Sequence, residues 1–344
     1  MANVNVTIIG MNRLGASIGM ALRALNSNPD RKHTFTITGS DKSAATLRAA
    51  TQRGALDIEQ TRLQEAVRTA NVVILSVPYQ DTETVLETIA PALKPGAVVM
   101  DCSPLKQPSI EWAAKYLPKD ADGDYQAYLV GATVMLSPDH LNTADETVSA
   151  ASADLFIDGV IIISPALDCP PDAVRLVSDL TELMGIKAHF TDPTEHDGIV
   201  AAMENLPLLL QMALWRTVSH QGWDDAQWFG NPLFYLMTHK LLDGDPESLG
   251  VGLYRNRSNV IRKLDALTEQ LAKLREQLQV EDELYIGEQI QAMMADYNRW
   301  ANARARNKFS SEPSPQELGE LRGASMFGAL LPNLALRKKD KSKK

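Results

Sequence analysis

The chain has 344 residues, with 34 Lys and Arg against 43 Asp and Glu, and a formal net charge of -9. The length predicts two domains, and a composition of 44% hydrophobic and 22% charged residues excludes wholesale disorder. The acidic balance argues against a general binder of nucleic acid or anionic membranes. Cys102 and Cys169 are the two cysteines, too few and too far apart for a disulfide framework or a zinc module, and no metal site is predicted.

The N-terminal residues MANVNVTIIG lack the basic stretch and apolar core of a signal peptide. No apolar run approaches the roughly 18–20 residues that span a bilayer. We therefore expect a soluble, cytoplasmic protein that does not interact with membranes and keeps its thiols reduced.

The first half of the chain alternates short β-branched runs with helical patterns. The predicted strands are residues 4–10, 34–38, 70–77, 97–101, 128–134 and 160–164, and the predicted helices are 14–25, 44–53 and 81–93. Parallel neighbouring strands need a crossover that covers the sheet, so this alternation favours a doubly wound, mostly parallel sheet. The predicted fold class is α/β.

From about Pro171 the pattern becomes helical, with predicted helices at 174–184, 197–218, 255–278 and 282–302. Helices of this length with an apolar stripe need a partner, and we expect a second subunit to supply it. The predicted domains are residues 1–168 (α/β), 169–306 (all-helical) and 307–344, an extended basic tail that is expected to be disordered and ends in RKKDKSKK.

A turn between the first strand and its helix is the sharpest local signal, Gly10-Met-Asn-Arg-Leu-Gly15. In a dinucleotide site the first glycine makes the tight turn, the third lets helix and strand approach, and the diphosphate sits on the helix N-terminus. Asn12 replaces the middle glycine and is expected to occupy space that the phosphates use, while Arg13 adds positive charge. The alternative is an ordinary strand–turn–helix that binds nothing.

Asp41 follows the second strand, where a carboxylate accepts hydrogen bonds from ribose hydroxyls and repels a 2′-phosphate. NAD is therefore the predicted cofactor, and Lys42, next in sequence, leaves NADP open. The alternative role for Asp41 is the N-cap of the helix at 44–53. The predicted cofactor-binding residues are Gly10, Asn12, Arg13, Leu14, Gly15, Asp41, Val77 and Pro78.

A series of motifs continues along most of the chain: IIGMNRLGASIGMALR, ANVVILSVPYQDTETVLETIAPALKPGAVVMDCSPLKQ, YLVGATVMLSP, DPTEHDGIVAAMENLPLLL and DGDPESLGVGLYRNRSNVI. In order and spacing this series resembles the prephenate/arogenate dehydrogenase family. The resemblance implies a Rossmann domain, an all-helical dimerisation domain and a homodimer. It also implies NAD(P)-dependent oxidative decarboxylation of prephenate or arogenate in tyrosine biosynthesis. In that reaction hydride leaves the hydroxyl-bearing ring carbon, and loss of carbon dioxide restores aromaticity.

The resemblance also places the substrate site, where four positions depart from the family. Thr133 stands for a histidine that hydrogen-bonds the ring hydroxyl, and Asn205 stands for the histidine of a Ser-His-Leu-Pro segment. Pro104 stands for a serine, with Ser103 one step away. Lys240 stands for an arginine that grips the substrate carboxylate, and it keeps the charge but loses the bidentate fork. The predicted catalytic residues are Thr133, Asn205, Lys240 and Ser103.

Three functions are compatible with this pattern. The first is a dehydrogenase of this family with a rebuilt site, in which His140 or His239 replaces a lost histidine. The second is an inactive or repurposed homologue, a dinucleotide-binding or scaffolding dimer. The third and weakest is oxidoreduction of an unrelated hydroxy acid. In an acidic chain, any anion site is expected to rely on the helix after Gly10 and on cations such as Arg13, Lys106 and Lys240.

Overall fold

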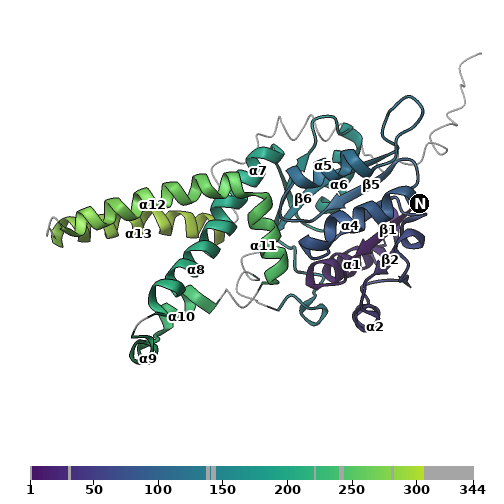
Figure 1. Ribbon diagram of the computed structural model, residues 1–344. Coiled ribbons are helices and arrows are strands. Elements are labelled where there is room, and N and C mark those ends of the chain that lie inside the picture. Colours follow the sequence, from purple (N-terminus) through teal and green to yellow (C-terminus); the bar gives the residue numbers. More distant parts are fainter. Residues whose placement is uncertain are drawn as a thin grey trace, which may run out of the picture. The chain divides into compact units, whose positions relative to one another are not determined.

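The computed structural model describes residues 2–29, 32–136, 140, 145–220, 222–239, 244–279 and 283–305 (Figure 1). The chain divides between Pro193 and Thr194 into two compact units, and each is described by itself. Lys240 and the predicted tail at 307–344 lie outside the described residues.

The first unit is built on one eight-stranded sheet in the order β3-β2-β1-β4-β5-β6-β7-β8. Its strands are β1 Ala2–Ile9, β2 His33–Ser40, β3 Ile58–Glu59, β4 Val72–Leu75, β5 Ala97–Asp101, β6 Ala127–Met135, β7 Val160–Pro165 and β8 Lys187–Phe190. β6 and β7 pair antiparallel, and the other neighbouring strands pair parallel. The predicted α/β class with a mostly parallel sheet is confirmed.

β4 is apolar throughout and β5 is apolar up to its last residue, Asp101, because helices cover a parallel sheet on both faces. All residues of β4 (VVIL) and β5 (AVVMD) are buried. The helices of this unit are α1 Arg13–Asn26, α2 Ala44–Gln52, α3 Leu63–Val67, α4 Tyr79–Ile89, α5 Gln107–Tyr116 and α6 Pro171–Leu183, with short 3-10 turns η1 Ala90–Ala92 and η3 Val148–Ala150.

β1 lies between β2 and β4, so the direction in which the chain adds strands reverses beside it. Ile9, the last residue of β1, pairs with Ser40 on one side and with Leu75 on the other. The carboxyl ends of three strands therefore meet at one edge of the sheet. Doubly wound sheets bind ligands in the crevice at such a point.

The unit extends further along the chain than the predicted division after residue 168. β8 pairs in parallel with β7, and α6 is the helix that connects these two strands. Both elements therefore belong to the first unit. β8 was not predicted from the sequence, because it is a four-residue strand, KAHF, with exposed and half-buried residues in alternation. Such a short and weakly apolar run carries little strand signal.

The second unit is helical throughout its described residues. Its elements are α7 Pro193–Val200, the π-helical turn η4 Ala201–Asn205, α8 Leu206–Val218, α9 Trp223–Ala226, η5 Gln227–Phe229, α10 Pro232–Thr238, α11 Pro246–Arg255, α12 Arg257–Gln279 and α13 Glu283–Ala305. The predicted helix at 197–218 contains the π-helical turn. The predicted helix at 255–278 begins at Arg257, because α11 ends at Arg255.

One helical segment of the described chain, Pro193–Val218, is long and apolar enough to cross a membrane, judged by length and composition alone. An 18-residue window within it has a mean hydropathy of 1.3, and 11% of that window is buried inside the structure. The expectation that no such segment exists was wrong, because it considered only uninterrupted apolar runs. An exposed apolar helix of this kind is also typical of a surface that another protein chain covers.

Candidate functional site: the dinucleotide turn and two polar networks

The predicted dinucleotide turn connects β1 to α1 at the reversal point of the sheet. Gly10 has φ +92°, the left-handed region that favours glycine, and a Cβ there would lie 2.2 Å from the carbonyl oxygen of Ser76. A Cβ at Gly15 would lie 2.0 Å from the carbonyl oxygen of Gly10. The two glycines therefore have the geometry of the first and third glycines of a dinucleotide turn.

Asn12, at the position of the middle glycine, is the N-cap of α1. Its Oδ1 accepts hydrogen bonds from the Gly15 N–H at 3.0 Å and from the Ser76 Oγ at 2.9 Å. Its Nδ2 donates to the carbonyl oxygen of Ser76 at 2.9 Å. The side chain therefore satisfies an N–H group of the first helical turn and joins α1 to the end of β4, a role that the sequence analysis did not assign to it.

Arg13, the first residue of α1, is 2% exposed. Its backbone N–H donates to the carbonyl oxygen of Glu146 at 2.8 Å, and its guanidinium lies 3.9 Å from the Glu146 carboxylate. Hydrogen bonds from Thr147 and, to a smaller extent, the charge of Arg13 lower the pKa of Asp145. Arg13 is therefore surrounded by protein groups of negative charge or polarity, rather than held open for a ligand.

Residues 145–152, the covering segment, lie against the start of α1. The Ser152 N–H donates to the Ser17 Oγ at 3.0 Å, and the Arg53 guanidinium donates to the carbonyl oxygen of Ala151 at 2.6 Å. The N-terminus of a helix attracts anions through its N–H groups and its dipole. The covering segment therefore places a carbonyl and two carboxylates near the place where a diphosphate is expected.

Asp41 joins the turn to the end of β2. Its Oδ2 accepts the Met11 N–H at 2.9 Å, and its Oδ1 accepts the Ser43 N–H at 2.8 Å. The alternative role as the N-cap of α2 is wrong, because the Ser43 side chain caps that helix by accepting from the Thr46 N–H. Each carboxylate oxygen of Asp41 keeps a lone pair that a ribose hydroxyl can use. Of the other predicted cofactor residues, Leu14 and Val77 are half-buried and Pro78 is exposed before α4.

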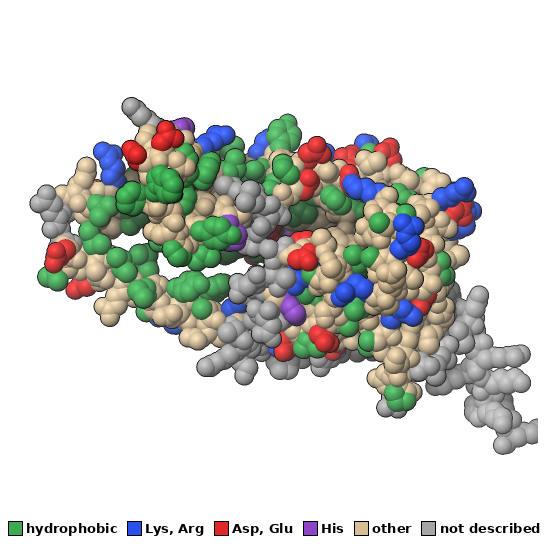
Figure 2. Space-filling view, turned by 90° about the horizontal axis from the view of Figure 1, so that it is seen from below, with side chains coloured by type: hydrophobic (Ala, Val, Ile, Leu, Met, Phe, Trp, Pro, Cys, Tyr) green, Lys and Arg blue, Asp and Glu red, His purple; other side chains and the backbone are tan. Residues whose placement is uncertain are grey.

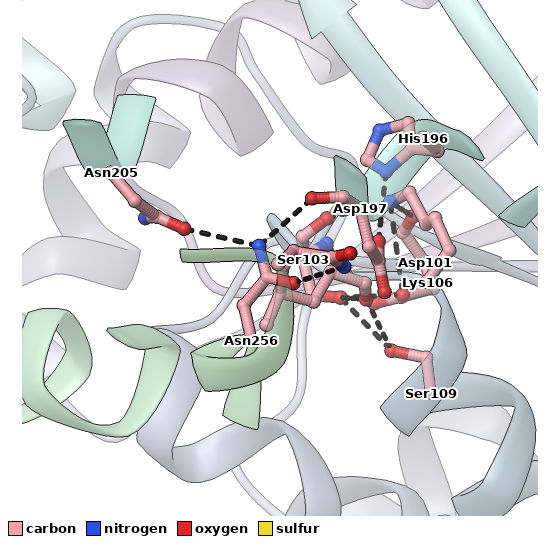
Figure 3. Close-up of polar contacts among 10 residues, drawn as sticks. Asp101, Ser103, Lys106, Ser109, His196, Asp197, Asn205 and Asn256 are labelled. Atoms are coloured by element: carbon pink, nitrogen blue, oxygen red, sulfur yellow. Dashed lines mark hydrogen bonds and ion pairs between the residues drawn. The ribbon is translucent and has the colours of Figure 1, made fainter. Parts of the chain in front are cut away.

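A buried polar network fixes the loop after β5 (Figure 3). The Lys106 Nζ donates to the carbonyl oxygens of Asp101 at 3.0 Å and Ser103 at 2.6 Å, and lies 3.9 Å from the Asp101 carboxylate. The Ser103 Oγ donates to Asp101 Oδ2 at 2.6 Å and lies 3.0 Å from the Ser109 Oγ. Lys106 is 0% exposed and its ammonium donates to these internal acceptors, so its role as a cation for a bound anion stays a prediction.

Thr133 lies on β6 opposite Ile162 of β7 and is 8% exposed. Gly131, two residues earlier, pairs with Asp101 of β5. A Cβ at Gly131 would lie 2.7 Å from the Cδ of Lys106. Two predicted catalytic residues therefore lie close in the fold, Ser103 in the loop after β5 and Thr133 on the neighbouring strand β6, and both are buried.

The second unit contains Asn205, the last residue of η4. Its Oδ1 accepts a hydrogen bond at 3.1 Å from the Nδ2 of Asn256, which also donates to the carbonyl oxygen of Asp197 at 2.8 Å (Figure 3). Asn256 is 4% exposed, and the sequence analysis did not identify it. His196 is 2% exposed and its Nδ1 lies 3.0 Å from the Asp197 carboxylate. His239, proposed as a substitute histidine, stacks on Tyr235 with ring centroids 4.9 Å apart.

The cysteines are poor candidates for a nucleophile. Burial raises the pKa of the Cys102 thiol to about 12 and that of Cys169 to about 11, so both are protonated at neutral pH. Within the described ranges, no three His, Cys, Asp or Glu side chains are grouped to hold a metal ion.

A glycine-built turn at the reversal point of a doubly wound sheet, followed by a helical unit, defines the class of two-domain proteins with a nucleotide-binding α/β domain. The family model described as the nucleotide-binding domain of prephenate dehydrogenase matches residues 28–190. The model described as the dimerisation domain of prephenate dehydrogenase matches residues 192–295. The chain belongs to the prephenate dehydrogenase family, and the predicted nicotinamide dinucleotide agrees with its nucleotide-binding domain.

Individual relatives are distant in sequence. A cyclohexadienyl dehydrogenase from Zymomonas mobilis is 27% identical over 62% of this chain and 67% of its own length. A prephenate dehydrogenase from Bacillus subtilis is 24% identical over 80% of this chain and 71% of its own. The prephenate dehydrogenase of Aquifex aeolicus in complex with hydroxyphenyl propionate and NAD+ has a TM-score of 0.73 at 20% identity, covering 86% of this chain and 98% of that one. These likenesses support the fold.

Proposed function

We propose that the chain is an NAD-dependent dehydrogenase that acts on prephenate, arogenate or a closely related carboxylate, through a substrate site that departs from the family pattern. The observation that carries this proposal is the succession of the two family domains over residues 28–190 and 192–295. The dinucleotide turn precedes the first match and supports it independently, because it is argued from the geometry of Gly10 and Gly15.

NAD fits the residues present. A Cβ at Gly10 or Gly15 would fill the turn, so the backbone is held close to β4 as a diphosphate site needs. Asp41 is placed to accept the ribose hydroxyls, which favours NAD, and the exposed Lys42 keeps NADP as the second choice. When bound, the nicotinamide ring supplies the hydride acceptor. The chain itself supplies the helix N-terminus for the diphosphate and a carboxylate for the ribose.

The substrate side is proposed to work with neutral hydrogen-bond donors. The Thr133 hydroxyl and the Asn205 amide can each donate to an oxygen, but neither takes up a proton near neutral pH. Such groups orient the hydroxyl oxygen while hydride leaves the carbon that bears it. The bond to the ring carboxylate then breaks, and its electron pair moves into the ring toward that oxygen, where a hydrogen-bond donor stabilises the charge. The oxygen ends as a phenol hydroxyl, so no net proton is released. The recovery of aromaticity on loss of carbon dioxide favours the reaction without a strong base.

The direct test is the absorbance of reduced nicotinamide when prephenate or arogenate is added to the purified protein with NAD+ or NADP+. Turnover of either acid that is faster with NAD+ is expected. Absence of turnover with both acids and both cofactors would overturn the enzymatic proposal.

The second candidate is an inactive dinucleotide-binding or scaffolding dimer. Thr133 and Ser103 favour it, because they are 8% and 5% exposed and stand at or beside positions where the family has a histidine and a serine. If the native protein is inactive because it lacks the two family histidines, the double change Thr133→His and Asn205→His should restore prephenate turnover. Measurable turnover by the native protein would eliminate this candidate.

We also propose a homodimer formed through the helices from Thr194 onward. Hydrophobic side chains gather over these helices, at the left of Figure 2. Exposed members include Trp228, Phe229, Leu233, Leu236, Leu284, Met294, Tyr297 and Trp300. An apolar surface of this kind marks a contact with another chain, and the dimerisation-domain match supports a second copy. Light scattering should give twice the chain mass. The cytoplasm, without membrane or nucleic-acid partners, stays the expected location.

A further inference from the structure

A chain of polar side chains in the second unit ends at Asn205. The Asn259 Nδ2 donates to the Asn256 Oδ1 at 2.8 Å, and the Asn256 Nδ2 donates to the Asn205 Oδ1 at 3.1 Å. At its far end, the Arg262 guanidinium donates to the Asn259 Oδ1. In this chain of three amides, each NH2 group donates to the amide oxygen of the next residue, in the direction from Asn259 to Asn205.

Groups of fixed polarity set that direction from two places. The carbonyl oxygen of Asp197 can only accept, so the atom of Asn256 that lies 2.8 Å from it must be the NH2 nitrogen. The guanidinium of Arg262 can only donate, so the atom of Asn259 facing it must be the amide oxygen. Both constraints require the same orientation of Asn256, and the oxygen of Asn205 must therefore face it.

The consequence lies at Asn205. Its oxygen is used by Asn256, and its NH2 group has no hydrogen-bond partner within the described part of the chain. The side chain is half-buried at the end of the π-helical turn η4, a widened geometry that often occurs at functional sites.

We propose that Asn205 presents its NH2 group to an acceptor oxygen of the substrate, a carboxylate or a carbonyl, and that Asn256 is the positioning residue that fixes this orientation. This inference rests on the proposed function and specifies how its substrate is held. An amide does not titrate, so the hydrogen bond persists over the whole working pH range. The family histidine that Asn205 replaces would lose its charge near pH 6.5.

The first experiment compares native protein with Asn205→Asp, Asn205→Ala and Asn205→His. Calorimetry measures binding of prephenate without NAD+ and of hydroxyphenyl propionate with NAD+ present, and steady-state assays with prephenate give kcat and KM. Asn205→Asp keeps the shape but replaces the donor with a carboxylate, so affinity for both acids should fall roughly 10- to 100-fold. The affinity for NAD+ should not change. Asn205→His should add a pH-dependent limb near pH 6.5 to the profile of kcat/KM.

Asn302→Asp is the matched control, since it makes the same chemical change at an exposed position of α13. It should leave the binding of both acids unchanged. Similar losses in Asn205→Asp and Asn302→Asp would show a general charge effect and would overturn the assignment.

The second experiment tests the positioning role of Asn256. Asn256→Ala should weaken binding of the acids about three- to tenfold, because the Asn205 amide is then free to rotate. In the Asn205→Ala background the same change should have no further effect on binding. A loss of similar size in that background would show a merely structural role. Thermal unfolding identifies any variant that fails to fold. If Asn256→Ala is such a variant, Asn259→Ala replaces it, because it removes the hydrogen bond that helps to orient the Asn256 amide.

The outcomes separate this inference from the function on which it rests. If native protein neither binds nor oxidises the acids, the proposed function fails and this inference with it. If native protein is active and Asn205→Asp binds the acids normally, only this inference is overturned.

Discussion

The backbone N–H of Arg13 donates to the carbonyl oxygen of Glu146, 2.8 Å away. An N–H of the first turn of α1, which in a dinucleotide site faces the diphosphate, thus already has a partner from the covering segment. The Glu146 carboxylate adds negative charge near the guanidinium of the same arginine. Binding of a dinucleotide is therefore expected to compete with this segment.

Glu146→Gln should tighten NAD+ binding about two- to fivefold, because it removes a charge that repels the diphosphate from the helix N-terminus. Calorimetry at low and high salt measures the effect, which should shrink at high salt as the charges are screened. Glu111→Gln, an exposed change on α5, is the control and should have no effect. Weaker binding by Glu146→Gln would show that the covering segment assists the cofactor.

Gly10→Ala should lower the free energy of unfolding by at least about 3 kcal/mol, because left-handed strain adds to a backbone overlap with Ser76. Gly96→Ala is the matched control, since Gly96 has φ +80° but a Cβ there meets nothing within 4 Å. It should cost about 1 kcal/mol, from strain alone. Urea unfolding measures both, and equal losses would contradict the close approach of β1 and β4.

Lys106→Met should lower the free energy of unfolding by roughly 3–5 kcal/mol, because it leaves the buried Asp101 carboxylate and two carbonyl oxygens without their cation. Lys115→Met, at an exposed position on α5, should change stability by less than about 1 kcal/mol. If the Lys106→Met variant kept native stability but no longer bound substrate, Lys106 would instead be a ligand-binding cation.

The thiols should react slowly in the native protein. With pKa values of about 12 for Cys102 and about 11 for Cys169, the reactive thiolate is a minute fraction at pH 8. A raised pKa disfavours the charged form, so labelling by a thiol reagent should accelerate about tenfold for each pH unit between 8 and 10. The unfolded chain is the control and should react quickly at pH 8. Fast labelling of native protein at pH 8 would contradict the raised pKa values of these half-buried thiols.

Local patterns predicted the sheet and the dinucleotide turn well. The runs at 72–75 and 97–100 are apolar because both faces of those strands are covered, and Gly10 and Gly15 occupy the positions that a tight turn requires. Family resemblance supplied Thr133, Asn205, Lys240 and Ser103, and their catalytic roles stay predictions.

Contacts between distant parts of the sequence were not predictable. Asn256 meets Asn205 across 51 residues of sequence, and no local pattern marks that pair. The covering segment reaches α1 from more than a hundred residues away, and the burial of Lys106 depends on Gly131 in a neighbouring strand. Charge and spacing suggested ligand-binding cations at Arg13 and Lys106, whereas the folded chain uses both side chains internally.

Asn12 has a further consequence for how the turn meets its ligand. A glycine at that position leaves the loop pliable, so that part of the ordering entropy is lost only when the ligand arrives. Here the Asn12 amide ties the helix start to Ser76 as the chain folds, and the loop is rigid beforehand. The chain has therefore exchanged an adaptable anion loop for a preorganised one, which tolerates fewer shapes of phosphate ligand but loses less entropy on binding the right one.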